Sequence, residues 1–423
     1  MTLLLRKLLR ILAVLTIRKF QPGIIAVTGT VGKTSTKEAI YAILRSVRQV
    51  RASSANFNNE LGLPLTILGD WNKIGQPIFF WPKVIISSCW QLLFGPAADG
   101  YPELLILEYA ADRPGDIKYL LSIARPQIAV ITAIGEIPVH VEFYASPEHV
   151  AREKARLVEV LPITGCAILN YDDELVYQMR ERTRAHIITY GFGQGANVRI
   201  SGLENRSEEI PVGHEQIWKP MGITFKLESG DNFIPIRLDG AFGKAQAYAM
   251  AAATAVGTIY GMNLITIAQA SQYYQPPQHR FKVIPGIKGT FILDDSYNAS
   301  PLSMAGALET VKSLKAKRKV GILGDMLELG EYTITAHEEA GRLAARVFDL
   351  LITVGSRSQL IAAAARKAGL DKKLIFSYDT ASEAGVAAQT LIEKGDLILV
   401  KASRGIGLER VVEEIKYRTA VIV

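Results

Sequence analysis

The stretch GIIAVTGTVGKTSTKEAI, residues 23–40, decides the fold. Its run IIAV is typical of a buried strand, and TSTKEAIYAILRS, which follows Lys33, is typical of a helix. Gly29 and Gly32 therefore lie where a strand ends and a helix begins. At such a position backbone N–H groups and the helix dipole converge on an anion. Lys33 would reach the terminal phosphates of a nucleotide, and the Thr34 hydroxyl could ligate magnesium.

The glycine turn is shorter than the common phosphate-binding loop, which reads G-x-x-x-x-G-K-[ST]. Only Thr30 and Val31 separate the two glycines here. Two interpretations stay open on this segment alone. It is either a shortened nucleotide loop or a tight turn that happens to precede a surface lysine.

A strand-then-helix rhythm extends this pattern through most of the chain. Apolar runs end in glycine, acid or asparagine, as in LLILEYAA, IAVITAIG, CAILNYDD, TFILDDSYN, KVGILGDM, LLITVGS and DLILVKAS. Helical patterns separate many of them. The alternation predicts an α/β fold with parallel sheets covered by helices, and functional loops at the carboxyl ends of the strands.

Two regions break the rhythm. Residues 71–94 are rich in Trp and Phe, and because Pro82 and Lys83 divide them we expect a buried or partner-facing insertion rather than a membrane span. Residues 196–239 show shorter, β-like segments, which predict an antiparallel addition to the first domain. After a long Ala-rich stretch, the prolines of YYQPPQHRF indicate a linker near Gln275.

Composition limits the classes of function. The 423 residues carry a net charge of +7, but no dense Lys/Arg run with interleaved aromatic residues occurs, so we expect no nucleic-acid partner. Cys89 and Cys166 have no metal-ligand spacing, which is typical of a reduced, cytoplasmic protein.

The first twenty residues, MTLLLRKLLRILAVLTIRKF, form an amphipathic helical pattern. Arg6, Lys7 and Arg10 interrupt the apolar run and no small-residue cleavage site follows, so we expect neither a signal peptide nor a membrane span. The leucines that lie largely on one helical face are Leu4, Leu5, Leu8, Leu9, Leu12 and Leu15. A helix docked on the domain and a helix lying on the inner face of an anionic membrane are both compatible with this pattern.

GTVGKTST resembles the nucleotide loop of the Mur ligase family, whose members carry a G-x-x-G-K-[ST] form and are ATP-dependent amide ligases of peptidoglycan precursor assembly. Further blocks resemble the family in order: NFNNELGLPLT from Asn56, LEYAADRPGDI, ITAIGEIPVHVEFYAS, VAREKARLVEVLP, PPQHRFKV, ILDDSYNASPLSM, LGDMLELGE and KASRGIGLERVV. The leucine pattern predicts a leading helix over 1–20. The resemblance, which covers the chain from about Gly23 onward, implies a P-loop ATP-binding domain with a mainly parallel sheet over 21–275 and a Rossmann-like α/β domain over 276–423.

The same resemblance implies roles for individual residues. The implied nucleotide contacts are Gly29, Thr30, Gly32, Lys33, Thr34, Ser35, Gln246, Arg280 and Asp295. The implied ligands for one or two Mg²⁺ ions are Thr34, Glu108, His140 and Lys154, the last as a carbamate. Lys33, His140 and Lys154 would serve catalysis, and the implied substrate contacts are Asn58, Asn59, Tyr297, Asn298, Ser403 and Arg404.

Residue types alone favour simpler interpretations at several of these positions. His140 would be a structural histidine and Lys154 a solvated helix lysine. Asp294 and Asp295 could cap the following helix, and Arg280 could pair with a surface acid. Ser403 and Arg404 could cap a helix or bind a carboxylate. Glu108 differs, because an acid at the end of an apolar strand is costly without a partner.

Two departures from the family pattern stand out. The nucleotide loop begins about twenty residues in, so we expect the usual N-terminal domain that binds the UDP-sugar to be absent. In GAFGKAQAYAMAAATA, Ala245 stands where the family has histidine, and Gln246 and Ala249 stand where it has asparagine. Ala402 likewise replaces a common glycine. Gln246 could still bond adenine.

DDSYNASP together with GDMLELG is similar to family members that join D-alanyl-D-alanine to a UDP-muramoyl tripeptide. The resemblance therefore implies a cytoplasmic, monomeric ligase that uses ATP and these two substrates. One alternative keeps the amide chemistry with a different acceptor or amine. Another is a membrane-associated nucleotide-binding protein without ligase activity, suggested by the leucine helix and by FFWPKVIISSCW.

Overall fold

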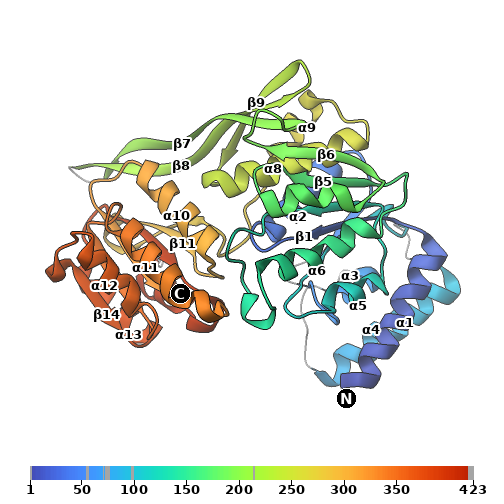
Figure 1. Cartoon of the computed structure of the whole chain (residues 1–423), viewed down its shortest axis with the longest axis horizontal. Helices are drawn as coiled ribbons and strands as arrows, with labels where there is room; N and C mark the ends of the chain where they lie inside the picture. The colour runs from blue at the N-terminus through green and yellow to red at the C-terminus, as the bar shows by residue number, and fades with distance from the viewer. Residues whose placement is uncertain are drawn as a thin grey trace, which may run out of the picture.

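Two α/β units, each built on its own sheet, make up the protein (Figure 1). The computed structural model describes residues 2–53, 57–69, 71, 77–96, 100–212 and 215–417. Asn56, at the start of the predicted asparagine-rich segment, and residues 72–76 of the Trp-rich region lie outside the described residues.

The first sheet has the strand order β2-β3-β1-β4-β5-β6-β7-β8-β9. Its strands are β1 Gly23–Thr28, β2 Val50–Ala52, β3 Leu104–Glu108, β4 Ile128–Ile131, β5 Cys166–Asn170, β6 His186–Gly191, β7 Val198–Val212, β8 Glu215–Ser229 and β9 Asn232–Asp239. Pairing is parallel from β2 to β7 and antiparallel between β7, β8 and β9.

The second sheet has the order β10-β11-β15-β12-β13-β14. Its strands are β10 Lys282–Pro285, β11 Phe291–Asp295, β12 Lys319–Gly324, β13 Leu350–Val354, β14 Ile375–Tyr378 and β15 Leu397–Lys401. All pairs are parallel except β10 with β11. The predicted fold class, a mainly parallel sheet with an antiparallel addition followed by a second α/β unit, is confirmed.

Helices cover both faces of each sheet. On the first sheet, one face carries α2 Lys33–Leu44, α8 Gly243–Ile259 and α9 Leu264–Ser271, and the other carries α1 Thr2–Phe20, α3 Gly62–Leu68, α4 Pro77–Phe94, α5 Asp116–Leu121, α6 Pro147–Glu159 and α7 Glu174–Tyr177. On the second sheet, α10 Pro301–Ser313, α11 Thr333–Ala344 and α12 Gln359–Lys367 lie opposite α13 Ala381–Leu391 and α14 Glu409–Ile415.

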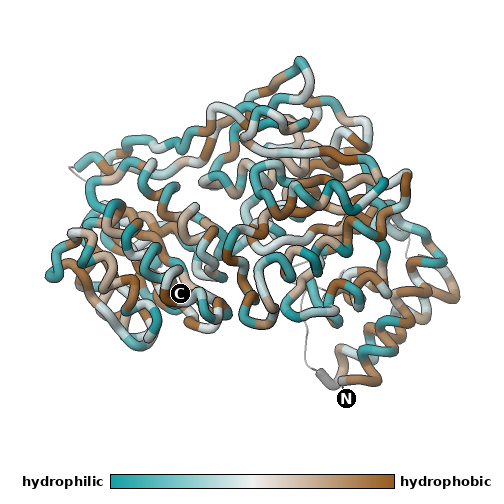
Figure 2. The backbone as a smooth tube through the Cα atoms, viewed as in Figure 1, coloured by the Kyte–Doolittle hydropathy of each residue, from teal (hydrophilic) through white to brown (hydrophobic). Residues whose placement is uncertain are grey.

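Strand β1 shows why the strands read as continuous apolar runs. Ile25 and Val27 point into the core under α2 and α8, whereas Ile24 and Ala26 point into the core on the opposite face. A central strand that is covered on both faces carries apolar side chains at consecutive positions, without alternating polar ones. Brown segments accordingly run through the interior of both units in Figure 2.

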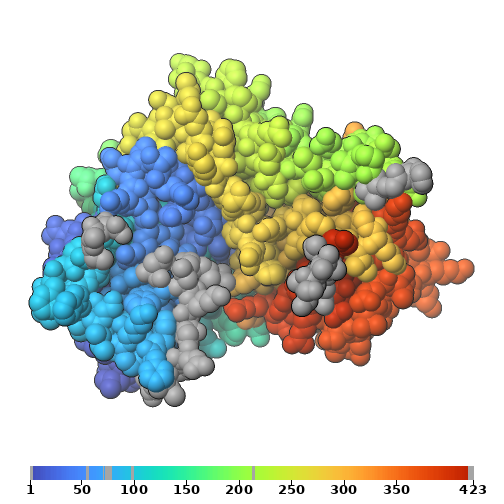
Figure 3. Space-filling model, turned by 180° about the vertical axis from the view of Figure 1, so that it is seen from behind, coloured from blue at the N-terminus to red at the C-terminus, as the bar shows by residue number. Residues whose placement is uncertain are grey.

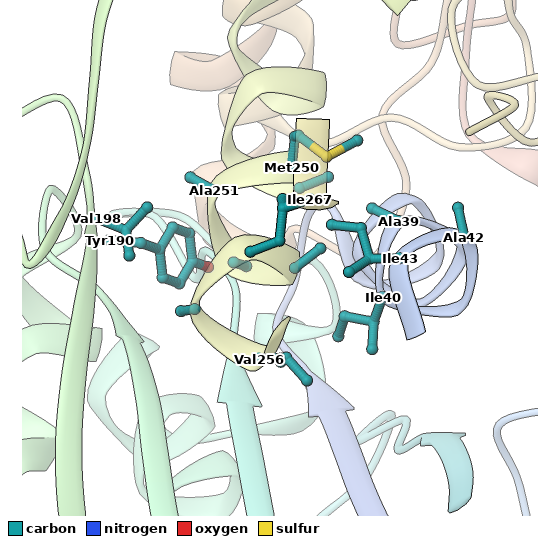
Figure 4. Close-up of a cluster of buried hydrophobic side chains, with 14 of the residues drawn as sticks. Ala39, Ile40, Ala42, Ile43, Tyr190, Val198, Met250, Ala251, Val256 and Ile267 are labelled. Carbon is teal, nitrogen blue, oxygen red and sulfur yellow. The ribbon is translucent and has the colours of Figure 1, made fainter. Parts of the chain in front are cut away.

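The core beneath α2 is close-packed because α8 is rich in alanine. Small side chains let α8 approach both its helical neighbour and the sheet. Figure 4 shows Ile40 and Ile43 of α2 on one side of α8 and Tyr190 and Val198 on the other. This packing fixes the first turn of α2, where the nucleotide loop ends.

The helix α4 differs from the sequence-based expectation. It runs unbroken through Pro82, whereas the sequence predicts a division of the segment there. Pro82 lies near the start of the helix and its side chain is exposed, so the lost backbone hydrogen bond falls on the solvent side. None of the helices in the described ranges is long and apolar enough to cross a membrane.

The antiparallel addition lies within the predicted residues, but β7 and β8 are longer than the short segments expected, with 15 residues each, and they reach the second unit. The β7–β8 hairpin extends over the second unit in Figure 1, and the view from behind in Figure 3 shows the same overlap. Ile217 of β8 is buried in the core of the second unit and belongs to the same cluster as Phe281 and Leu397. Asn205 Nδ2 also donates to Ser313 Oγ at 2.8 Å. The two units are therefore joined by packing as well as by the chain near residue 275.

Candidate active site

The glycine turn follows β1 and begins α2. Gly32 is the N-cap residue of α2 with φ of 91°, and Gly29 has φ of 148°. A Cβ atom on Gly29 would lie 1.9 Å from Thr132 Oγ1, so only glycine fits. The N–H groups of Thr30 and Val31 donate to the carbonyl of Ala133, which ties the loop to the end of β4.

Lys33 lies across this loop. Its ammonium donates to the carbonyl of Gly29 at 2.9 Å and to that of Thr30 at 3.3 Å. Burial lowers the pKa of Lys33, and the nearby Arg280 lowers it further, while Glu108 opposes the shift. A cation held this way, beside the N-terminus of α2, is placed to bind a polyphosphate.

Glu108 is the centre of a small oxygen-rich cluster. It ends β3 and its side chain is almost fully buried. Thr34 Oγ1 donates to Glu108 Oε2 at 3.2 Å, and Asn58 Nδ2 donates to Oε1 at 3.1 Å. The structure thus brings together three predicted site residues from three separate blocks of sequence.

This cluster fits Mg²⁺. The ion takes oxygen ligands and usually keeps one or two carboxylates, several waters and substrate phosphates. Glu108 and Thr34 supply that donor set next to the phosphate loop. Across the described ranges, no group of three or more His, Cys, Asp or Glu side chains is arranged to hold a metal without such added ligands.

Lys154 and His140 form the second part of the site. Lys154, on α6, is buried, and burial followed by the charge of Lys33 lowers its pKa to about 7. A neutral amine is the form that takes up carbon dioxide, so this lysine fits a carbamate. Burial lowers the pKa of His140 too, against the opposing charges of Asp112 and Glu328, which favours the neutral imidazole that ligates metals.

His140 is held between two carboxylates. Its Nε2 lies 3.2 Å from Asp112 Oδ1, and its Nδ1 lies 2.5 Å from Glu328 Oε2. Glu328 belongs to the second unit, after β12, so the contact crosses from one unit to the other. The backbone at His140 is left-handed, with φ of 69°. Such strain at a polar residue is typical of functional sites.

The second unit presents its own polar groups at the ends of β11 and β15. Lys401 Nζ lies 2.5 Å from Asp295 Oδ2 and 3.0 Å from the carbonyl of Asn298. The guanidinium of Arg280 lies 4.1 Å from the ring centre of Tyr297, and that of Arg404 lies 5.6 Å from it. These predicted residues form one cluster.

A cavity of about 1070 Å³ separates the two clusters. Thr30, Gly32, Thr34, Ser35 and Gln246 line it from the first unit, and Arg280, Asp295, Asn298, Ser300 and Lys401 line it from the second. Its size and its mixture of apolar walls with convergent polar groups suit a nucleotide.

Several predicted residues make local contacts. Asn59 Oδ1 accepts the N–H groups of Leu61 and Gly62, in the first turn of α3. Gln246 is buried and its side-chain oxygen accepts a hydrogen bond from the Tyr274 hydroxyl.

The alternative capping roles are wrong for the two aspartates and for Ser403. Ser300 caps α10. Asp294 instead binds Ser296 and His279. Ser403 Oγ accepts the N–H of Leu327 at 2.9 Å and makes no cap bond.

Sequence reasoning did not select Lys401, Asp112 or Glu328 as site residues. Lys401 carries a signal that could have found it, because it is a charged residue at the end of an apolar strand, like Glu108. Asp112 and Glu328 lie in loops, and only the fold shows that they meet at His140.

Two family models match the chain. The Mur ligase middle domain matches residues 27–73 and 90–257, and the Mur ligase glutamate ligase domain matches residues 279–404. The chain belongs to the Mur ligase family. These matches confirm the family resemblance that the ordered sequence blocks indicated.

Individual relatives agree with the family. This Mur ligase is 31% identical over 396 residues to the UDP-N-acetylmuramoyl-tripeptide–D-alanyl-D-alanine ligase of Bacillus subtilis, covering 93% of this chain and 75% of that protein. It is 32% identical over 408 residues to the ligase of the same name from Mycobacterium leprae, covering 91% and 72%.

Solved structures show the same fold. The MurF ligase of Thermotoga maritima in complex with ADP has a TM-score of 0.75 at 25% identity, covering 97% of this chain and 83% of that one. A folylpolyglutamate synthase of Mycobacterium tuberculosis, at 15% identity and a TM-score of 0.66, shares the fold.

Proposed function

We propose that this Mur ligase uses ATP to join D-alanyl-D-alanine to a UDP-muramoyl tripeptide, forming an amide bond with ADP and phosphate as the other products. The curated relatives at 31% and 32% identity carry that name and align over most of their length. The observation that carries the proposal is the cavity in which the phosphate loop faces Arg280 and Asp295 of the other unit.

In the first step, a carboxylate oxygen of the tripeptide attacks the γ-phosphorus of ATP. The bond from that phosphorus to the bridging oxygen breaks, ADP leaves, and an acyl phosphate forms. Lys33 and Arg280 supply positive charge from the two units, and the N-terminus of α2 adds its dipole. Charge held in advance where negative charge moves is the main source of rate in such transfers.

In the second step, the amine of D-alanyl-D-alanine attacks the acyl carbon. The tetrahedral intermediate releases phosphate and the amine loses a proton, which leaves the amide. We propose that Tyr297, Asn298, Ser403 and Arg404 hold the substrates on the second unit, and that Asn58 and Asn59 do so on the first. The stacked Arg280, Tyr297 and Arg404 support this placement.

Magnesium would be held by Thr34 and Glu108, and a second ion by His140 and a carbamate on Lys154. When bound, these ions neutralise phosphate charge. The chain's own contribution is to position these ligands: Asn58 holds Glu108 by a hydrogen bond, and Asp112 and Glu328 flank the imidazole of His140.

We propose that the ligase acts as a monomer in the cytoplasm. Cys89 and Cys166 are free, which is compatible with a reduced compartment. We propose the chain divides into the leading helix 1–20, the ATP-binding domain 21–275 and the domain 276–423. At the inner face of the membrane, α1 would provide the contact.

Purified protein incubated with ATP, Mg²⁺, UDP-muramoyl tripeptide and D-alanyl-D-alanine tests the activity. Phosphate release that needs both substrates, with the pentapeptide product detected by mass, is the expected outcome. Release that needs a different amine would contradict the substrate assignment while keeping the amide chemistry. ATP binding without any turnover would contradict the whole proposal.

A further inference from the structure

The helices α1 and α4 lie side by side at one edge of the first unit (Figure 1). Their inner sides are anchored, since Leu9, Leu12 and Ala13 of α1 and Val84 of α4 are buried in the core. Both helices run brown over much of their length in Figure 2. Neither contributes a residue to the cavity of the candidate active site.

The outer sides of these helices are also apolar. We call the exposed apolar residues the α1–α4 surface: Leu3, Leu4, Ile11, Leu15, Phe79, Ile86, Trp90, Leu93 and Phe94. Those on α4 are 63% to 77% exposed and recur at the spacing of a helical stripe. Large apolar side chains gathered in this way mark an interaction surface, in contrast to single exposed residues.

The charge on the two helices has a single sign. Arg6, Lys7, Arg10, Arg18 and Lys19 belong to α1 and Lys83 to α4, and neither helix contains Asp or Glu. Arg6 pairs with Glu60 from outside the two helices at 2.7 Å. Lys7, Arg10, Arg18, Lys19 and Lys83 are exposed.

Family membership does not account for these helices. The middle-domain model begins at residue 27, after α1, and leaves residues 74–89 unmatched, which removes most of α4. Six of the nine residues of the surface, all but Trp90, Leu93 and Phe94, therefore lie outside the matched parts of the family domains.

We propose that the α1–α4 surface docks on a bilayer that carries anionic lipids. Exposed Leu, Ile, Phe and Trp side chains enter the headgroup boundary of a membrane, and Lys and Arg beside them bind anionic headgroups. The two helices lie on the membrane rather than cross it, in keeping with their length and charge.

A second copy of the chain fits this surface less well. A two-fold interface sets each surface against itself, so both basic sets would meet without a carboxylate from either α1 or α4. Like charges at close range oppose association. An anionic lipid surface complements the same charges.

Flotation of the full chain with lipid vesicles tests the proposal. We expect the protein to float with vesicles of phosphatidylglycerol and phosphatidylcholine, to stay behind with phosphatidylcholine alone, and to be released as salt rises. Equal flotation with both vesicles, or none with either, would overturn it. ATP turnover does not enter this measurement, so failure of the ligase proposal would leave the result unchanged.

Matched variants locate the contact. Ile86→Gln, Trp90→Gln and Phe94→Gln combined should weaken vesicle binding about tenfold or more. Phe233→Gln, Ile265→Gln and Val386→Gln, equally exposed and far from α1 and α4, should leave it unchanged. An equal loss in both triple variants would contradict the assignment.

A second set of variants tests the charge. Lys7→Gln, Arg18→Gln and Lys83→Gln should each cost roughly fivefold in affinity, or about 100-fold together. The control is Lys367→Gln, Lys372→Gln and Lys373→Gln, exposed lysines of the second unit. No difference between the two sets would contradict a role for α1 and α4 charge.

Tryptophan fluorescence gives a readout that does not depend on triple variants. Lipids brominated on their chains should quench the wild-type protein, and Trp90→Phe should remove much of that quenching. Sedimentation without lipid tests whether a second copy of the chain occupies the surface instead. A dimer that becomes a monomer in the combined Ile86, Trp90 and Phe94 variant would overturn the membrane assignment.

Discussion

Lys33 folds over the carbonyl groups of the glycine turn, beside the first turn of α2. Lys33→Ala removes the cation that this loop holds for the phosphates. We expect kcat for phosphate release to fall about 100-fold or more, because a positioned charge stabilises the transition state in a site with little water. A malachite-green assay of released phosphate measures this.

Lys118→Ala, an exposed lysine on α5, is the control and should keep full activity. Circular dichroism should show both variants folded. Turnover by Lys33→Ala at the rate of the parent would remove the nucleotide loop from the mechanism.

The pKa of Lys154, lowered to about 7, predicts a pH dependence. An ordinary lysine stays protonated until about pH 10.4, whereas Lys154 is mostly neutral above pH 7 and mostly charged below it. Because only the neutral amine takes up carbon dioxide, carbamate should form at pH 8 and disappear near pH 6. Carbon-13 NMR with labelled bicarbonate detects the carbamate resonance.

Lys154→Met should lack that resonance, since methionine fills a similar volume without an amine. The same signal in this variant would assign the carbamate to another lysine. No signal in the parent at pH 8 would mean that Lys154 acts as an amine.

Some of the individual residues of the candidate site could be predicted from the sequence. Lys33 and Thr34 were predicted because their positions follow from a strand, a turn and a helix in order. Glu108 was predicted because it ends an apolar strand and stands in a block that resembles the family. Asp112 and Glu328 could not be predicted, because their contact with His140 depends on how two units meet.

Among the elements, the β7–β8 hairpin makes a contact that can be measured. Ile217→Ala removes a side chain buried in the second unit, and should lower the free energy of unfolding by about 2–4 kcal/mol. Urea denaturation gives the change, and amide hydrogen exchange should rise first where the hairpin meets the second unit.

Ile187→Ala, on the more exposed start of β6, should change stability by less than about 0.5 kcal/mol. Equal stability of Ile217→Ala and the parent would show that the hairpin does not hold the second unit in solution.

The elements themselves followed from sequence more completely than the site did. The parallel strands were predicted because β1, β3, β4 and, in the second unit, β11, β12, β13 and β15 are covered on both faces and so read as apolar runs. The contact between the hairpin and the second unit was not predicted, because the sequence around Ile217 is typical of any strand with an inward-facing side chain.

For the whole molecule, nucleotide binding should need both units. Arg280 reaches from the second unit toward Lys33, so Arg280→Ala should weaken ATP binding about 10- to 100-fold, the cost of a lost charged hydrogen bond. Titration calorimetry measures the affinity.

Arg366→Ala, on α12, is an exposed control and should bind ATP normally. Arg280→Lys keeps the charge but loses the planar group that stacks on Tyr297. Its affinity for ATP should therefore lie between that of Arg280→Ala and that of the parent. Normal affinity in Arg280→Ala would mean that the first unit binds ATP alone.

The hairpin that carries Ile217 attaches the second unit to the first in addition to the chain crossing near residue 275. A movement that pulled the second unit away from the hairpin would expose apolar side chains of this buried cluster to water, which is unfavourable. The hairpin therefore favours the arrangement in which Arg280 and Lys401 line the cavity across from the loop.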